Sequence, residues 1–279
     1  MNPSADFYRK VYPFSALFVI CALFLVWYLT PRAESALTTP ERVEIANYDI
    51  RADKSETARA TTEKFVSEAG KTASDIAAAL KPVTRAESTL RTKVPGLKIE
   101  RSENLQVPEV ISADFVRSAA FLTAPSGEKR AVILKNFLEE NAGLFGLNDS
   151  QIDALKLAAD YTNPDGNLSY VHFEQRINGI GVFGGEVKAG LTKRGEIIRV
   201  INNLAPGLDY GSLSTDFGNP LDAVKAAAGF INTDAGKLDL RQNEAASTNL
   251  KTIFGEGDWA TGAEKMYFPT EPGVAVPAW

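Results

Sequence analysis

Side chains that commonly carry out catalysis are sparse in this 279-residue chain, which contains a single histidine, His172. A zinc site of the His-Glu-x-x-His type needs two imidazoles on one face of a helix, and one histidine cannot supply them. A Ser-His-Asp triad needs only one histidine, but no Gly-x-Ser-x-Gly segment is available to hold the serine. We therefore interpret His172 as a polar residue on a sheet surface and assign no catalytic or metal-binding residue.

Two further patterns could in principle carry chemistry. Glu139 and Glu140 are adjacent carboxylates, but they follow the apolar residues Leu134 and Phe137 in a predicted helix. They are interpreted as its solvated face, because nothing in the sequence provides a pocket that would shift a pKa. The glycines of residues 179–185 lack the Gly-x-x-x-x-Gly-Lys-Ser/Thr pattern of a phosphate-binding loop. Neither pattern therefore predicts an enzyme.

The composition excludes several classes of partner. The net charge is −5, and no basic stripe with interleaved aromatic residues is present, so nucleic acid is not an expected partner. The only cysteine, Cys21, lies in an apolar N-terminal run, which leaves the rest of the chain without a disulfide framework or a thiolate metal site. No cofactor is expected in this chain. Hydrophobic residues make up 44% of the sequence, enough for a sizeable core.

The N-terminal apolar run is a membrane-targeting segment. Residues 11–31 carry no charge, and Arg9 and Lys10 precede them. One interpretation is a signal peptide over residues 1–35, with Ala33-Glu34-Ser35 as the cleavage site. The other is an uncleaved anchor that crosses the membrane through residues 11–31, since a span takes about 20 residues. Both predict an exported protein that is secreted, periplasmic or anchored to the membrane.

Residues 36–125 are expected to form an arm followed by a helix. The stretch Val43–Arg51 alternates loosely, as in an edge strand or an ordered arm. A weak apolar stripe over residues 56–80 predicts a helix that Pro82 ends. Residues 81–98 are then expected to form a polar connection.

A second helix is predicted after residue 125. Ser126 is placed to cap it, apolar residues Ile133 and Leu138 lie on its buried side, and Gly143 is placed to end it. A short helical turn around Ile152 should follow.

An antiparallel meander comes next. Strands are predicted over residues 155–162, 168–177, 182–191 and 196–203. In the second of these, Val171 and Phe173 alternate with Tyr170 and His172, the period of a sheet with one buried face. Asn178-Gly179 is a strong hairpin signal. A helix packed on a meander sheet gives the class α+β.

A smaller unit is expected over residues 208–279. Asn219-Pro220 begins a helix that runs to Ile231, with the cap and the first-turn proline in order. A strand opens at Glu264. We expect this helix-plus-strand unit to be incomplete and truncated, because it has too few strands to close its own core.

Residues 166–202 resemble the fungalysin/thermolysin propeptide (FTP) module. The matching segments are Tyr170-Val171-His172-Phe173-Glu174-Gln175, Asn178-Gly179-Ile180-Gly181-Val182-Phe183-Gly184-Gly185-Glu186, and Gly195 before the last strand. Gly181 stands where the family pattern has proline, which loosens the turn but keeps the register. Residues 47–51 are similar to the mature start of bacterial fungalysin-type precursors, and residues 219–231 and 266–279 to a PepSY-like segment of the same prosegment.

The resemblance implies the prosegment of a secreted zinc metallopeptidase of the fungalysin (M36) type, with a cystatin/PepSY-like fold. Its domains would be a signal peptide or anchor (1–35), an arm and helix (36–125), an FTP-like domain (126–207) and a truncated PepSY-like segment (208–279). Such prosegments assist folding of the peptidase domain and block its cleft. Zinc is expected only in that domain, a partner in cis or in trans that this chain lacks. The candidate interface is Tyr170, His172, Phe173, Gln175, Asn178, Gly179, Val182, Phe183 and Gly184.

A second hypothesis is a standalone inhibitor or binding module, exported or tethered to the membrane. The two differ in whether the reading frame or the adjacent DNA encodes His-Glu-x-x-His. A complete hydrolase would require peptidase activity of residues 36–279 with added zinc, which we do not expect.

Overall fold

A computed structural model describes residues 48–118 and 120–279. The predicted targeting segment at residues 11–31, Cys21 and most of the expected arm lie outside these residues. Within the described part, no helix is both long enough and apolar enough to cross a membrane.

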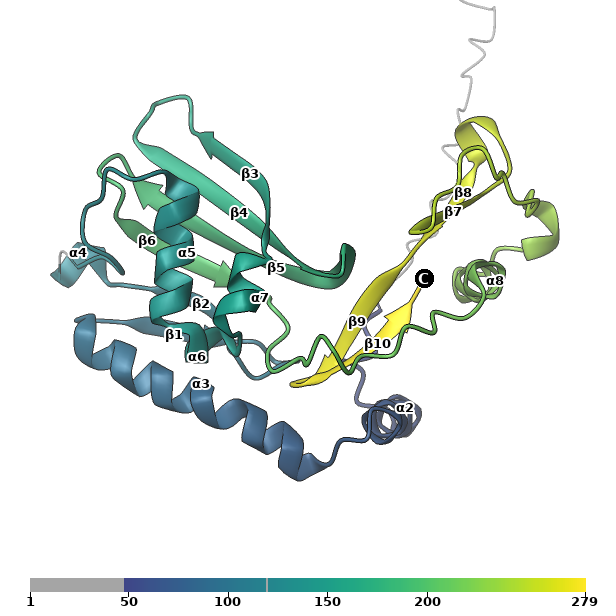
Figure 1. Cartoon of the computed structure of the whole chain (residues 1–279), viewed down its shortest axis with the longest axis horizontal. Coiled ribbons are helices and arrows are strands. Elements are labelled where there is room, and N and C mark those ends of the chain that lie inside the picture. The colour runs from purple at the N-terminus through teal and green to yellow at the C-terminus, as the bar shows by residue number, and fades with distance from the viewer. Residues whose placement is uncertain (1–47, 119) are drawn as a thin grey trace, which may run out of the picture. The chain divides into compact units, whose positions relative to one another are not determined.

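The centre of the described protein is a mixed sheet (Figure 1). Its antiparallel strands follow the spatial order β1 (Lys98–Arg101), β2 (Pro108–Ser112), β6 (Ile197–Asn202), β5 (Ile180–Thr192), β4 (Leu168–Ile177) and β3 (Lys156–Thr162). A hairpin of β9 (Met266–Glu271) and β10 (Val274–Ala278) joins this sheet through parallel pairing of β9 with β5. With helices packed against it, the sheet confirms the predicted α+β class.

The meander β3–β6 follows from local sequence signals. Its strands lie within two residues of the predicted ranges, and β4 coincides with its range. Asn178 and Gly179 have φ of 52° and 86°, the left-handed conformations that a two-residue hairpin turn requires. Along β4, Val171 and Phe173 are buried while Tyr170 and His172 are half-buried, as the alternation predicts.

A layer of helices covers one face of the sheet (Figure 1). It contains α5 (Arg130–Glu140), α6 (Ala142–Phe145) and α7 (Asp149–Asp153). Leu134 and Phe137 of α5 are buried in one core with Phe173 of β4 and Val187 of β5. These contacts anchor the meander to a rigid support. A short helix, α4 (Phe115–Ser118), lies between β2 and α5 in the chain.

The predicted helix over residues 56–80 is wrong in its bounds. The structure has two helices, α2 (Glu56–Glu68) and α3 (Ala73–Lys93), and Pro82 lies inside α3. The break between them is set by Thr72, whose side chain accepts a hydrogen bond from the Asp75 backbone while the Asp75 carboxylate accepts one from the Thr72 backbone. Leu90 of α3 enters the core, so tertiary packing overrides the proline signal. Residues 81–93 are therefore helical rather than a connection.

The expected ends of the next helix also differ from the structure. Helix α5 begins at Arg130 with Lys129 at its N-cap, and the Ser126 hydroxyl instead accepts a hydrogen bond from the Glu128 backbone. Gly143 does not end α5 but lies inside α6, where an added Cβ would be 3.4 Å from the Pro82 carbonyl oxygen. Gly143 thus lets α6 approach α3 closely.

The chain after residue 207 contains a helix and two short sheet pairings. Helix α8 (Pro220–Phe230) is capped by Asn219, as predicted. It packs on a separate two-stranded sheet of β7 (Lys251–Phe254) and β8 (Thr261–Glu264), with 3-10 turns η1 (Ala235–Lys237) and η2 (Gly257–Trp259) in the loops.

One strand of this C-terminal unit, β9, pairs with β5 of the meander at Gly181 and Val182. The larger sheet contains β1 and β2, which precede residue 125, and β9 and β10, which follow residue 207. The expected domain boundaries at residues 125 and 207 remain predictions.

Candidate functional site

Strand β5 contains a wide bulge at the resemblance motif. Glu174 pairs with Glu186, and Arg176 pairs with Gly181. Gln175 alone lies between these pairs on β4, whereas residues 182–185 lie between them on β5; we call these residues the β5 bulge. At Gly185, an added Cβ would lie 2.8 Å from the Val182 Cβ, so only glycine fits there. Beyond the bulge β5 pairs with β6, whereas at Gly181 and at the first bulge residue, Val182, β5 pairs with β9. The sheet therefore forks here.

The buried side chain of Gln175 connects β4 at the fork to the segment that follows β6. Its Oε1 accepts a hydrogen bond from the Ala205 backbone at 2.8 Å, and its Nε2 donates to the Ala205 carbonyl at 3.1 Å and to Tyr210 Oη at 3.0 Å. Burial raises the pKa of Tyr210, so its hydroxyl stays protonated at neutral pH. Gln175 thus ties β4 to the segment that follows β6.

The apex of the β5 bulge is aromatic and partly exposed. Phe183 is 44% exposed, and its ring centroid lies 5.3 Å from that of Phe268 on β9. The Arg51 guanidinium lies 4.9 Å from the Phe268 centroid and 5.9 Å from that of Phe183. The Arg51 guanidinium donates hydrogen bonds to both carboxylate oxygens of Asp49, which fix the guanidinium and hold the pKa of the Asp49 carboxyl below its usual range. The apex therefore joins the arm, the meander and β9.

A polar ladder occupies the sheet face opposite the helices. Arg176 Nη2 lies 2.9 Å from Glu174 Oε2, and His172 Nε2 lies 2.9 Å from Glu186 Oε2. Lys188 Nζ lies 2.5 Å from the other oxygen of Glu186. At the end of the ladder, the rings of Tyr170 and Tyr161 stack at 5.2 Å. The charges of Glu174 and Arg176 compensate one another, as do those of Glu186 and Lys188, whereas His172 Nε2 lies close to Glu186 without a hydrogen bond of proper geometry among the described residues.

The residues predicted for the interface separate into four groups. Phe173, Gln175 and Val182 are buried, and Phe183 and Gly184 form the exposed apex. Tyr170 and His172 belong to the polar ladder, and Asn178 and Gly179 are exposed at the β4–β5 turn. The buried residues therefore shape the surface, and only the others can contact a partner.

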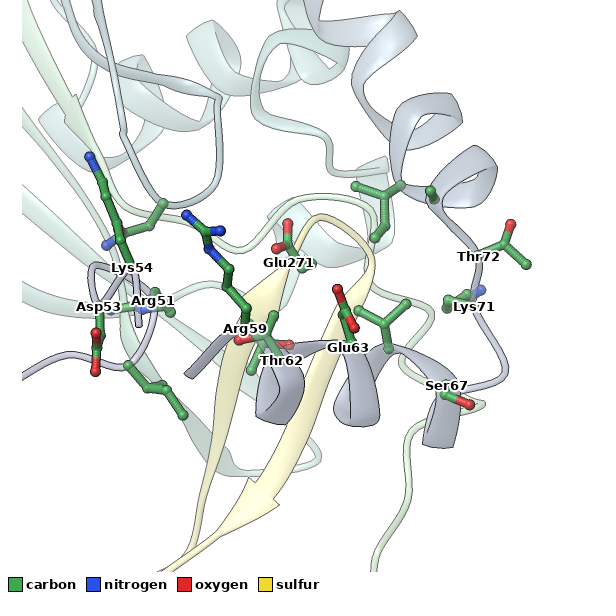
Figure 2. A pocket seen from close by; sticks show the side chains of 16 residues that line it. Arg51, Asp53, Lys54, Arg59, Thr62, Glu63, Ser67, Lys71, Thr72 and Glu271 are labelled. Carbon is green, nitrogen blue, oxygen red and sulfur yellow. The ribbon is translucent and has the colours of Figure 1, made fainter. Parts of the chain in front are cut away.

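A hollow of about 510 Å³ lies between α2, the start of α3 and the β9–β10 turn (Figure 2). Arg59 and Glu63 of α2 and Glu271 of β9 extend into the same space (Figure 2). Burial raises the pKa of the Glu271 carboxyl. The Thr270 hydroxyl on its wall is buried and has no hydrogen-bond partner among the described residues. Within those residues, no group of three or more His, Cys, Asp or Glu side chains could hold a metal ion.

Two residues of the apex, Arg51 and Phe268, lie in segments that the resemblance covers, residues 47–51 and 266–279, but they were not predicted as interface residues. Each is far from Phe183 along the chain, and nothing in the sequence indicates that the three side chains meet. The pairing of β9 with β5 and the arm contact bring them together. Only a prediction of long-range contacts would have found them.

One comparison with known proteins covers the region of this site. Residues 153–204 match the model of a family described as Fungalysin/Thermolysin Propeptide Motif. The matched range contains β3 to β6, Gln175 and the whole β5 bulge, and it confirms the resemblance of this region. No curated protein matches the chain. The match places a fungalysin/thermolysin propeptide motif at residues 153–204 of the chain.

Proposed function

We propose that this chain is the propeptide region of a secreted fungalysin-type (M36) zinc metallopeptidase. In this role it is an intramolecular chaperone and an inhibitor, and zinc belongs to the peptidase domain. The observation that carries the proposal is the family match over the entire meander, together with the hydrogen-bonded fork that it contains. The PepSY-like nature of residues 208–279 belongs to the same proposal.

The proposed mechanism is templating followed by steric exclusion. A preformed surface that binds the native-like peptidase, but not its unfolded chain, lowers the free energy of the folded state. A rigid surface loses little conformational entropy on binding, and Gln175 provides that rigidity at the fork. Once bound, the same surface excludes substrate from the cleft.

Phe183 is the proposed contact at the apex. Large aromatic side chains carry much of the energy of protein interfaces, and this one is fixed by Phe268 and Arg51 while it remains 44% exposed. The ladder residues Tyr170 and His172 offer a neighbouring polar surface. The charged pairs beside them, Arg176–Glu174 and Lys188–Glu186, contribute mainly to orientation and specificity.

The first experiment is to sequence the DNA on both sides of this coding region. We expect a His-Glu-x-x-His peptidase in the same frame or in the adjacent gene. That peptidase domain is then purified and denatured, and its refolding yield and its hydrolysis of a chromogenic peptide are measured with the 279-residue chain added in trans. The chain should raise the yield and suppress hydrolysis. If the chain changes neither the refolding yield nor the hydrolysis rate of the neighbouring peptidase, the standalone module becomes the better hypothesis.

Phe183→Ala tests the contact itself. Loss of an interface anchor is expected to raise the inhibition constant about tenfold, since such an anchor contributes more than about 1 kcal/mol. Phe230→Ala is the matched control, because Phe230 is a comparably exposed phenylalanine on α8, 54% exposed. Equal inhibition by both variants would exclude the apex as the contact.

A further inference from the structure

The tip of the β7–β8 hairpin exposes a large aromatic side chain. Trp259 is 94% exposed, and no ring or cation contact to another described residue covers its indole. The other described tryptophan, Trp279, contacts Phe217 at 6.5 Å between centroids, lies beneath Lys265 and donates its indole N–H to the Gly218 carbonyl. Tryptophan is on average a highly buried residue and is enriched at protein interfaces, so an indole with this exposure is a candidate contact for a partner.

Backbone hydrogen bonds hold the chain at Trp259 in a defined turn. The Gly255 N–H donates to the Arg241 carbonyl at 2.9 Å, and the Ala260 N–H donates to the Gly257 carbonyl at 3.2 Å. Gly255 has φ of 77°, and an added Cβ would lie 3.0 Å from the Asp239 carbonyl oxygen, so the turn needs glycine there. A hydrogen-bonded turn lowers the entropic cost of ordering the backbone on binding.

The charges beside Trp259 indicate the kind of partner. Glu256 and Asp258 flank it in the chain and are exposed. The nearby Arg241 is engaged by Asp239 through two hydrogen bonds. The rim of the tip is therefore acidic. An anionic membrane surface would repel it, whereas a protein pocket with an apolar floor and cationic rim would complement it.

We propose that Trp259 is an anchor that inserts into an apolar pocket with a cationic rim on the cognate peptidase domain. This contact rests on the proposed function and is separate from the Phe183 apex, which lies in a different sheet. The acidic rim guides the encounter, and the indole slows dissociation. The propeptide region would thus hold its peptidase at two points.

The experiment uses the 279-residue chain and the purified peptidase domain from the neighbouring frame or gene. Trp259→Ala should weaken binding at least tenfold, mainly through faster dissociation. Glu256→Gln with Asp258→Asn should slow association several-fold at low salt, while Glu264→Gln on β8 should not. The fluorescence difference between the wild type and Trp259→Phe, with peptidase present, should be the blue-shifted emission of a buried indole.

The outcomes separate this contact from the proposed function. If the wild-type chain inhibits the peptidase and Trp259→Ala binds it equally well, the Trp259 proposal is wrong and the proposed propeptide function stands. Absence of binding by the wild type would overturn both proposals. A blue shift on anionic vesicles of phosphatidylcholine and phosphatidylglycerol that depends on Trp259, with none on peptidase, would assign the tip to a membrane instead. An unchanged urea midpoint for Trp259→Ala shows that the variant is folded.

Discussion

Gln175 is a buried polar residue whose side chain replaces backbone hydrogen bonds that are lost at the β5 bulge. At the β5 bulge the regular ladder is interrupted, and the Gln175 amide makes the hydrogen bonds to Ala205 that the ladder cannot make. The sequence shows that this residue lies on the buried face of β4, but the alternation alone predicts an apolar side chain there. Its role emerges only from the bulge, which is a feature of backbone geometry.

Gln175→Ala should therefore be strongly destabilising. The substitution leaves the Ala205 N–H and carbonyl without partners in a buried site, and we expect a loss of about 2–4 kcal/mol in the free energy of unfolding. Urea denaturation measures it. Gln242→Ala, at an exposed glutamine, is the control and should change stability by less than about 0.5 kcal/mol. A similarly small loss of stability for Gln175→Ala would contradict the proposal that the Gln175 hydrogen bonds stabilise the fork.

Glu271→Gln tests the partly buried carboxyl in the hollow. Burial raises the folded-state pKa of Glu271 above its unfolded value, so ionisation penalises the folded state. The penalty is absent below the unfolded pKa, grows as pH rises toward the folded pKa and is complete above it. The melting temperature of Glu271→Gln should match the wild type near pH 4 and exceed it increasingly toward pH 7. Exposed Glu264→Gln should show no such divergence.

At the scale of elements, local signals predict the meander well. The Asn178-Gly179 turn and the alternation along β4 are short-range properties, so four strands could be placed from sequence. Strands β1 and β2 could not, because they are short and depend on pairing with β6. Helix α3 was predicted to stop at Pro82 because the proline signal is local, whereas the burial of Val83 and Leu90 that sustains the helix is tertiary.

Pro82→Ala should stabilise the protein. Proline inside a helix removes one backbone hydrogen bond and costs up to about 3 kcal/mol relative to alanine. Pro82 is exposed, and alanine keeps the Cβ that faces Gly143, so we expect a gain of about 1–3 kcal/mol in the free energy of unfolding. The neighbouring exposed Lys81→Ala is the control. Loss of stability at Pro82 would mean that its ring makes an essential contact.

At the scale of the whole described chain, Arg51 connects parts that are distant in sequence. It contacts Phe183 and Phe268 and donates to the Pro269 carbonyl at 3.4 Å. Arg51→Ala should release the arm, because a partly desolvated cation–π contact contributes about 1–2 kcal/mol. Amide hydrogen exchange near Ala52 and Asp53 should then accelerate about 5- to 30-fold, with exchange in β4 unchanged. Arg59→Ala, whose side chain makes no ion pair with a described residue, is the control.

The candidate site was predicted in part. The motif identified Phe183 and Gly184, yet it grouped them with Phe173 and Val182, which are buried. Trp259 was not predicted at all, since a single exposed aromatic residue in a polar loop has no pattern around it. Sequence patterns predict which residues are buried and where turns lie. A binding surface depends on which side chains stay exposed once segments distant in sequence have packed together.

The pairing of β2 with β6 sets the order in which the sheet can form. Val110 and Ile201 are partners, and the whole helical layer and most of the meander lie between them in sequence. A chain synthesised from its N-terminus therefore carries β1 and β2 without their neighbour until β6 is complete. The closing of such a long loop is slow compared with a hairpin. We therefore expect the β4–β5 hairpin to form before β2 pairs with β6 and before β9 pairs with β5.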